Sequence, residues 1–210
     1  MNSAIETYIT DHSSPEDDLL KRLNRETHLK VLNPRMLSGH VQGRFLEMIS
    51  KMIRPQRILE IGTYTGYSAI CLAKGLAGNG ILHTIEVNPE LEEFAKRYFR
   101  EAGLESQIIQ HGGDALELLP QIDETFDLVF IDAAKESYLD YYHLIFDKVR
   151  KGGFILADNA LWDGKVVDPN QVQDKETQGI MAFNDFIRKD DRVENVLLSL
   201  RDGIMIIRKL

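Results

Sequence analysis

The sequence predicts a doubly wound α/β domain, in which short apolar strands alternate with amphipathic helices. Residues 57–73, RILEIGTYTGYSAICLA, are typical of a buried strand, a turn bearing two glycines and a helix. Further strand and helix patterns follow in alternation, as expected of a largely parallel sheet with helices on its faces. The chain closes with two strand patterns, residues 193–200 and 204–208, and the Asp-Gly turn between them indicates an antiparallel pair.

The elements are predicted in chain order from periodicity and from capping and turn residues. Helices are expected before the first strand at residues 4–10, 17–32 and 40–53. After the first strand-to-helix unit we expect strands at 81–87, 107–111, 126–131 and 152–157, helices at 89–102, 114–119, 137–149 and 179–188, and a turn-rich loop at 158–177. The prediction is a single domain over 1–210, with a helical lead-in over 1–54 and an α/β core over 55–210.

Composition excludes several classes of protein. The 43% hydrophobic and 28% charged residues are ordinary for a soluble globular domain, and the net charge of -8 argues against a nucleic-acid partner. No apolar run has transmembrane length, and the first residues lack a basic region followed by an apolar core, so no membrane partner and a cytoplasmic location are expected. Cys71 is the one cysteine, which excludes an intrachain disulfide and predicts a packing role.

The turn bracketed by Gly62 and Gly66 is the default cofactor site, because ligands in open α/β sheets lie outside the carboxyl ends of the strands. Glu86 follows about 20 residues later, where an acidic group accepts hydrogen bonds from ribose hydroxyls; the alternative is a solvated glutamate at a helix start. Glu60 lies between apolar residues, so its carboxylate needs a ligand ammonium, backbone N–H groups or an internal partner. Asp114 accepts from an exocyclic amine such as that of adenine, or caps the following helix.

Two later strands each end in oxygen-bearing side chains. Asp132 follows FDLVFI, and Asp158 and Asn159 follow GGFILA. If these strands are neighbours about 5 Å apart, the three side chains converge at one edge of the cofactor pocket. Two carboxylates and an amide oxygen suit Mg²⁺, Mn²⁺ or Ca²⁺. The alternative is that Asp158 and Asn159 begin a turn while Asp132 caps a helix.

Lys135 lies three residues after Asp132. A lysine has a reference pKa of about 10.4, and a nearby cation disfavours its charged form. This placement predicts a metal-assisted base, against the alternative of an exposed lysine at a helix entry.

Several motifs together carry a family resemblance. In order and spacing, ILEIGTYTGYSAICLA, TIEVNPE, FIDAAKESYLDYY and FILADNALWDGKV resemble the cation-dependent S-adenosylmethionine O-methyltransferases, which include caffeoyl-CoA and catechol O-methyltransferases. The segments MLSGHVQGRFL and DGIMIIRK are similar too, so the resemblance runs from Met36 to the end. It implies a class I methyltransferase fold: a Rossmann-like seven-stranded sheet, mostly parallel with an antiparallel last strand, helices on both faces and a helical lead-in.

The resemblance also implies roles for individual residues. Asp132, Asp158 and Asn159 match the family's metal ligands, and Lys135 matches its general base. The positions that match contacts to S-adenosylmethionine are Met36, Ser38, Glu60, Gly62, Tyr64, Ser68, Glu86, Asp114 and Asp132, with Met36 and Ser38 at the methionine end. The implied cofactors are S-adenosylmethionine and a divalent cation, Mg²⁺ before Mn²⁺ or Ca²⁺. The implied partners are a small catechol-type acceptor and a second copy of the chain in a homodimer.

The chain departs from the family pattern at Ala134, where an acidic residue usually precedes the lysine. Metal binding is still expected, because Asp132 is present, but the departure leaves the adenine side and the tuning of Lys135 open. Trp162, in the loop that lines the acceptor pocket in this family, is either a substrate wall or a loop anchor.

The predicted reaction is methyl transfer to one hydroxyl of a vicinal diol. Both diol oxygens chelate the cation, Lys135 removes a proton, and the oxyanion attacks the sulfonium methyl group in line. A nicotinamide-dependent oxidoreductase is an alternative, but no tyrosine near residue 140 has a lysine four residues later. A nucleic-acid N-methyltransferase would carry a Pro-Pro-aromatic motif after the fourth strand, which is absent from the sequence. A non-catalytic protein that binds S-adenosylmethionine is the remaining alternative.

Overall fold

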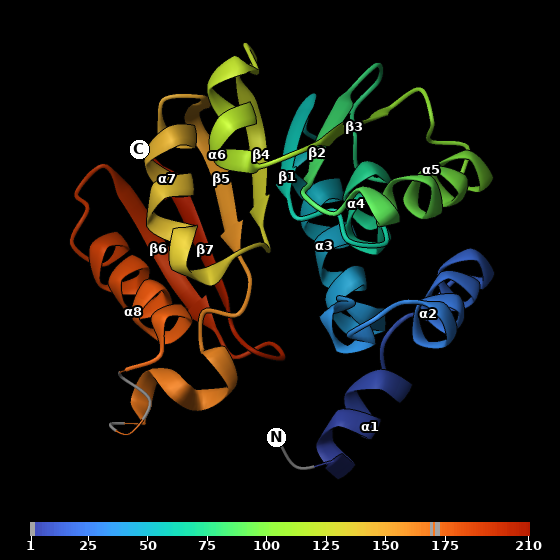
Figure 1. The fold of residues 1–210 in the computed structure, drawn as a ribbon, viewed down its shortest axis with the longest axis horizontal. Coiled ribbons are helices and arrows are strands. Elements are labelled where there is room, and N and C mark those ends of the chain that lie inside the picture. Colours follow the sequence, from blue (N-terminus) through green and yellow to red (C-terminus); the bar gives the residue numbers. More distant parts are fainter. Residues whose placement is uncertain (1–2, 169, 171–172) are drawn as a thin grey trace.

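The structure, a computed structural model, describes residues 3–168, 170 and 173–210. One seven-stranded sheet has the order β3-β2-β1-β4-β5-β7-β6 (Figure 1). The five strands from β1 to β5 are parallel, and β7 runs antiparallel to both β5 and β6. The strands are β1 (Arg57–Ile61), β2 (Ile81–Glu86), β3 (Ile108–Gly112), β4 (Phe126–Ile131), β5 (Val149–Ala157), β6 (Val193–Leu198) and β7 (Ile204–Lys209).

Helices cover both faces of this sheet (Figure 1). They are α1 (Ser3–Asp11), α2 (Asp18–Lys30), α3 (Gly39–Ile53), α4 (Tyr67–Ala73), α5 (Glu92–Glu101), α6 (Ala115–Leu118), α7 (Tyr138–Phe146) and α8 (Lys175–Ile187). Short 3₁₀ segments are η1 (Pro34–Met36), η2 (Pro89–Leu91), η3 (Leu119–Gln121), η4 (Lys135–Ser137) and η5 (Trp162–Val167). Among the described helices, none combines the length and the apolar character needed to cross a bilayer.

The predicted fold class, with its antiparallel last strand, is confirmed. Among the boundaries that differ from the prediction, two have a clear local cause. The helix expected to reach residue 149 ends at Phe146, because the next strand already begins at Val149 and continues through Gly152 and Gly153. The helix expected from residue 179 begins at Lys175, where the Asp174 side chain accepts a hydrogen bond from the Thr177 amide. The predicted loop 158–177 includes residues 169, 171 and 172, and the lead-in 1–54 includes residues 1 and 2, all of which lie outside the described residues.

Two apolar cores lie on opposite faces of the sheet. In β4, Val129 and Ile131 contribute to the core under α6, α7 and α8, while Leu128 and Phe130 contribute to the core under α3, α4 and α5. This strand is therefore buried on both faces, which explains its continuous apolar sequence. Cys71 is fully buried in the second core, so its predicted packing role is confirmed.

The lead-in helix α3 packs closely against α4. A Cβ atom at Gly43 would lie 2.5 Å from the Tyr67 ring and 2.9 Å from Cys71 Sγ. The Tyr67 ring is buried and its hydroxyl donates to Glu16 at 2.5 Å, so the ring has little freedom to move. This contact fixes the position of α3, which carries the buried side chain of Gln42 towards the end of β5.

One ionisable side chain lies inside the sheet. Glu60, in β1, has no exposed surface; its Oε2 accepts a hydrogen bond from the Thr84 hydroxyl at 2.5 Å, and its Oε1 has no hydrogen-bond partner. Burial raises the pKa of Glu60 from 4.5 to about 8, against the opposing effect of the Ser68 and Thr84 hydroxyls. The carboxyl group is therefore protonated and neutral at pH 7.

Gly43→Ala should destabilise the protein although alanine is the better helix former. The new methyl group overpacks the α3–α4 contact, and we expect the free energy of unfolding to fall by about 1–3 kcal/mol. Gly112→Ala is the matched control, since a Cβ there meets one atom, Glu92 Oε2, at 4.0 Å. Urea unfolding measures both changes. Equal effects of the two substitutions would contradict the packing argument.

Glu60→Gln should change how stability depends on pH. The folded state keeps a proton that the unfolded chain releases above pH 4.5, so this group's contribution to stability declines between about pH 4.5 and 8. The amide cannot ionise. We therefore expect the stability of the variant relative to wild type to rise by at least about 1 kcal/mol between pH 5 and 8.

Urea titrations at several pH values measure this difference. The exposed Glu105→Gln should give a flat difference over the same range. A flat difference for Glu60→Gln as well would show that Glu60 ionises normally in the folded protein.

Candidate active site

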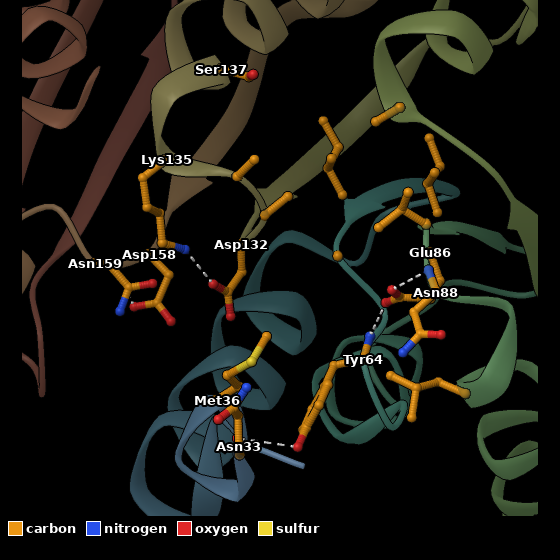
Figure 2. Close-up of a pocket in the computed structure, with 18 of the residues that line it drawn as sticks. Asn33, Met36, Tyr64, Glu86, Asn88, Asp132, Lys135, Ser137, Asp158 and Asn159 are labelled. Atoms are coloured by element: carbon orange, nitrogen blue, oxygen red, sulfur yellow. Dashed lines mark hydrogen bonds and ion pairs between the residues drawn. The ribbon is translucent and has the colours of Figure 1, made fainter. Parts of the chain in front are cut away.

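A cavity of about 1190 Å³ lies at the carboxyl ends of β1, β2, β4 and β5. It exceeds the usual 300–1,000 Å³ of a ligand pocket, so it has room for two ligands side by side. Nine of the predicted site residues line it: Met36, Gly62, Tyr64, Glu86, Asp114, Asp132, Lys135, Asp158 and Asn159. All of these except Gly62 and Asp114 are labelled in Figure 2.

The glycine turn after β1 is shaped by packing against the neighbouring strand end. Gly62 has a φ of 104°, and a Cβ there would lie 1.9 Å from the carbonyl oxygen of Asp132. Any side chain at this position would push the ends of β1 and β4 apart. The packing of the two strand ends therefore requires a glycine at position 62, apart from any close approach of a ligand that the glycine also allows.

Glu86 is fixed at the end of β2 by backbone groups. One carboxylate oxygen accepts from the Tyr64 amide at 2.6 Å, and the other accepts from the Asn88 amide at 2.9 Å (Figure 2). Each oxygen has a second lone pair and the side chain lines the cavity, so the geometry suits hydrogen bonds from ribose hydroxyls. The Tyr64 hydroxyl donates to the Leu32 carbonyl at 3.1 Å, which ties this turn to the lead-in.

The sequence leaves two roles open for Asp114, a helix cap and a ligand contact, and its position is compatible with both. Its Oδ1 accepts from the Leu116 amide at 2.8 Å, so it caps α6. The residue also lines the cavity. The capping role is confirmed, and the contact to an adenine amine stays a prediction.

The register of β4 and β5 brings Asp132 and Asp158 together. Ile131 pairs with Ala157, and the Asp158 amide donates to the Ile131 carbonyl at 2.9 Å, so the two aspartates follow at the same level. Asp158 is 3% exposed. Burial and the negative charge of Asp132 raise the pKa of Asp158 to about 7, while the Gln42 amide lowers it.

Asn159 follows Asp158 in the left-handed region, with a φ of 55°. Its Nδ2 donates to Asp202 Oδ2 at 3.0 Å, which turns the amide oxygen away from Asp202. Among the described residues, no group of three or more His, Cys, Asp or Glu side chains is arranged to hold a metal ion. The predicted set has two carboxylates that repel one another and a carbonyl-type oxygen, and this hard donor set fits a divalent cation.

Lys135, in η4, is buried beside these acids. Its Nζ lies 2.9 Å from Asp132 Oδ1 and 2.9 Å from the Tyr138 hydroxyl (Figure 2 shows the pair with Asp132). The Trp162 ring centroid is 5.8 Å from the same nitrogen. Burial favours the neutral amine, but Asp132 and Tyr138 outweigh it and raise the pKa of Lys135 above its usual value.

Three predicted contacts to S-adenosylmethionine do not line the cavity. Glu60 and Ser68 are buried behind it, and Ser38 is buried with its carbonyl oxygen bound by Arg201. Their roles stay predictions. Trp162 lines the cavity and also packs against the core under α7 and α8, so both sequence interpretations of this residue are compatible with its position.

Four residues around the acids were missed in the sequence. Tyr138 holds Lys135, Gln42 holds Asp158, and Arg201 and Asp202 lie in the β6–β7 turn. The signal available was the antiparallel last strand itself. If β7 is placed beside β5, the turn before β7 must lie at the carboxyl end of β5.

Comparisons with known proteins agree with this geometry. A model of the O-methyltransferase family matches residues 10–210. A probable caffeoyl-CoA O-methyltransferase 2 of Dictyostelium discoideum is 35% identical over all of this chain and 93% of its own length. A catechol O-methyltransferase of Niastella koreensis is 35% identical over 94% of this chain and 90% of its own length.

Solved structures show the same fold. An O-methyltransferase from Bacillus cereus in complex with SAH superposes with a TM-score of 0.88 at 30% identity, covering 99% of this chain and 97% of that one. An SAH-bound methyltransferase from Podospora anserina has a TM-score of 0.92 at 26% identity, with 99% and 94% covered. The cavity at the strand ends and these likenesses together show that the chain belongs to the O-methyltransferase family and is an S-adenosylmethionine-dependent enzyme.

Proposed function

We propose that this enzyme requires a divalent cation and methylates one hydroxyl of a catechol-type small molecule. The observation that carries the proposal is the convergence of Asp132, Asp158 and Asn159 with the buried amine of Lys135 in one cavity. The names of the similar proteins, caffeoyl-CoA and catechol O-methyltransferases, support the same class of acceptor. The homodimer and the cytoplasmic location expected from the sequence stay predictions.

Different residues of the cavity would bind the cofactor and the cation. Glu86 would bind the ribose of S-adenosylmethionine, Asp114 would receive its adenine amine, and Met36, which Figure 2 shows apart from Glu86, would contact the methionine end. Asp132, Asp158 and Asn159 would hold the cation. Mg²⁺ is the first expectation, with Mn²⁺ and Ca²⁺ accepted by the same oxygens.

Lys135 is the group that takes the proton from the acceptor hydroxyl. An amine must be neutral to do so, whereas Asp132 and Tyr138 favour its charged form in the absence of other ligands. A bound divalent cation supplies positive charge that lowers the pKa of both the acceptor hydroxyl and the Lys135 ammonium. The acceptor oxygen, held in line with the methyl group, then displaces the neutral thioether, and Lys135 keeps the proton.

Loss of the cation should abolish methyl transfer. We expect turnover with S-adenosylmethionine and a panel of catechols to fall at least about a hundredfold in chelator, and to return with Mg²⁺. Asp158→Ala should stay inactive in Mg²⁺ while its affinity for S-adenosylmethionine, measured by calorimetry, changes less than about threefold. Asp123→Asn, an exposed substitution just before the amino end of β4, removes the same charge away from the cavity and is the control.

Two other outcomes have clear meanings. Turnover that persists in chelator would rule out the cation. Tight binding of S-adenosylmethionine with no transfer to any diol, with or without Mg²⁺, would favour the non-catalytic binding protein.

Replacing Lys135 should remove the base while sparing cofactor binding. We expect Lys135→Met to lower kcat by about 10²–10⁴, with the KM for S-adenosylmethionine nearly unchanged. Lys135→Arg should be similarly slow, because a guanidinium keeps the charge beside Asp132 but does not accept a proton. Lys165→Met is the matched control, since Lys165 also lies over the Trp162 ring, at 5.0 Å, but is outside the cavity lining. Substantial turnover by Lys135→Arg would show that the charge, and not proton transfer, is what the reaction needs.

A further inference from the structure

The β6–β7 turn packs directly against the segment that follows β5. The Ala160 amide donates to the Gly203 carbonyl at 2.9 Å, and the Leu161 amide donates to the Asp202 carbonyl at 2.9 Å. Gly203 has a φ of 85°, and a Cβ there would lie 2.5 Å from Leu161 Cγ. The turn is therefore held at a fixed distance from Asp158 and Asn159.

Asp202 fixes the orientation of one candidate ligand. Its side chain accepts hydrogen bonds from Asn159 Nδ2, at 3.0 Å, and from the Asp163 amide. An amide side chain has a donor end and an acceptor end, whereas an ionised carboxylate only accepts. Asp202 thus selects the nitrogen of Asn159 and leaves the oxygen of that amide for a cation.

Arg201 fixes the other candidate ligand through Gln42. Its Nη1 donates to Gln42 Oε1 at 2.9 Å and to the backbone carbonyls of Leu37 and Ser38. A guanidinium only donates, so it selects the oxygen end of the Gln42 amide. The nitrogen end of Gln42, fully buried, then donates to Asp158 Oδ2 at 2.6 Å.

We propose that Arg201 and Asp202 are positioning residues for the cation site: Asp202 orients Asn159 directly, and Arg201 orients Asp158 through Gln42. Two consecutive turn residues thus act on two consecutive strand-end residues. The inference rests on the proposed cation site and adds to it the residues that set its geometry. Partners of this kind hold metal ligands in their binding orientation, and their loss typically weakens metal affinity 10- to 100-fold.

The test measures Mn²⁺ binding to the metal-free full chain by the electron paramagnetic resonance signal of free Mn²⁺, without acceptor or turnover. Asp202→Asn should weaken binding at least about tenfold, because the introduced amide can donate to the Asn159 oxygen and turn it from the cation. Asp123→Asn, which removes one carboxylate elsewhere, should bind as wild type does. Thermal unfolding of each variant checks that the fold is kept.

The exchange variant Asn159→Asp with Asp202→Asn separates orientation from general structure. It keeps the net charge and inverts donor and acceptor, so one oxygen of the new carboxylate accepts from the new amide and the other faces the cation. We expect Mn²⁺ affinity to return to within about threefold of wild type. Arg201→Met should weaken binding by a smaller factor than Asp202→Asn, because its effect passes through Gln42.

The outcomes distinguish this inference from the proposed function. If the wild-type chain does not bind Mn²⁺, the cation site itself is wrong and the positioning roles are wrong with it. If the wild type binds and Asp202→Asn binds equally well, only the positioning role is overturned. Weak binding by Asp202→Asn that the exchange does not restore would also overturn it, since a general structural effect predicts no rescue.

Discussion

The carboxyl ends of β1, β4 and β5 lie at the same level, and the rest of the structure depends on this alignment. Parallel pairing aligns Ile61 with Ile131 and Ile131 with Ala157, so the next residue of each strand emerges at one edge. The missing side chain of Gly62 lets the backbone of Asp132 approach, and a shift of one residue between β4 and β5 would separate the two aspartates or turn them to opposite faces. The cavity, its charges and its supporting contacts all follow from this alignment.

Asp132 is the electrostatic centre of the site. The same carboxylate pairs with the amine of Lys135 and opposes the charge of Asp158, so it raises the pKa of both neighbours. With Asp158 ionised, two carboxylates face one ammonium and the charges are not balanced. This imbalance supports the proposed cation independently of the likeness to other methyltransferases.

Local pattern was sufficient for the order of the elements and for the residues that directly follow strands, such as Asp132, Asp158 and Glu86. It was insufficient where placement depends on the pairing of distant segments. Gln42 and Asp202 look like ordinary helix and turn residues until β7 is inserted between β5 and β6. Ser38 and Ser68 were assigned by resemblance, and their burial behind the cavity depends on how α3 and α4 pack. Val149 was placed at the end of a helix, whereas β5 begins there and runs three residues ahead of the predicted strand at 152–157.

Because β7 runs in the reverse direction, the residues that support Asp158 and Asn159 and the residues around Trp162 belong to different segments of the chain. The side chains that hydrogen-bond to Asp158 and Asn159 come from α3 and the last turn, whereas Trp162 and the segment after it lie in a connection between β5 and α8. The described residues of that connection beyond Asp163 make no hydrogen bond to the side chain of Gln42 or Asp202, so changes there leave these contacts in place. Selection for a new acceptor can therefore act on one part of the chain while another preserves the chemistry.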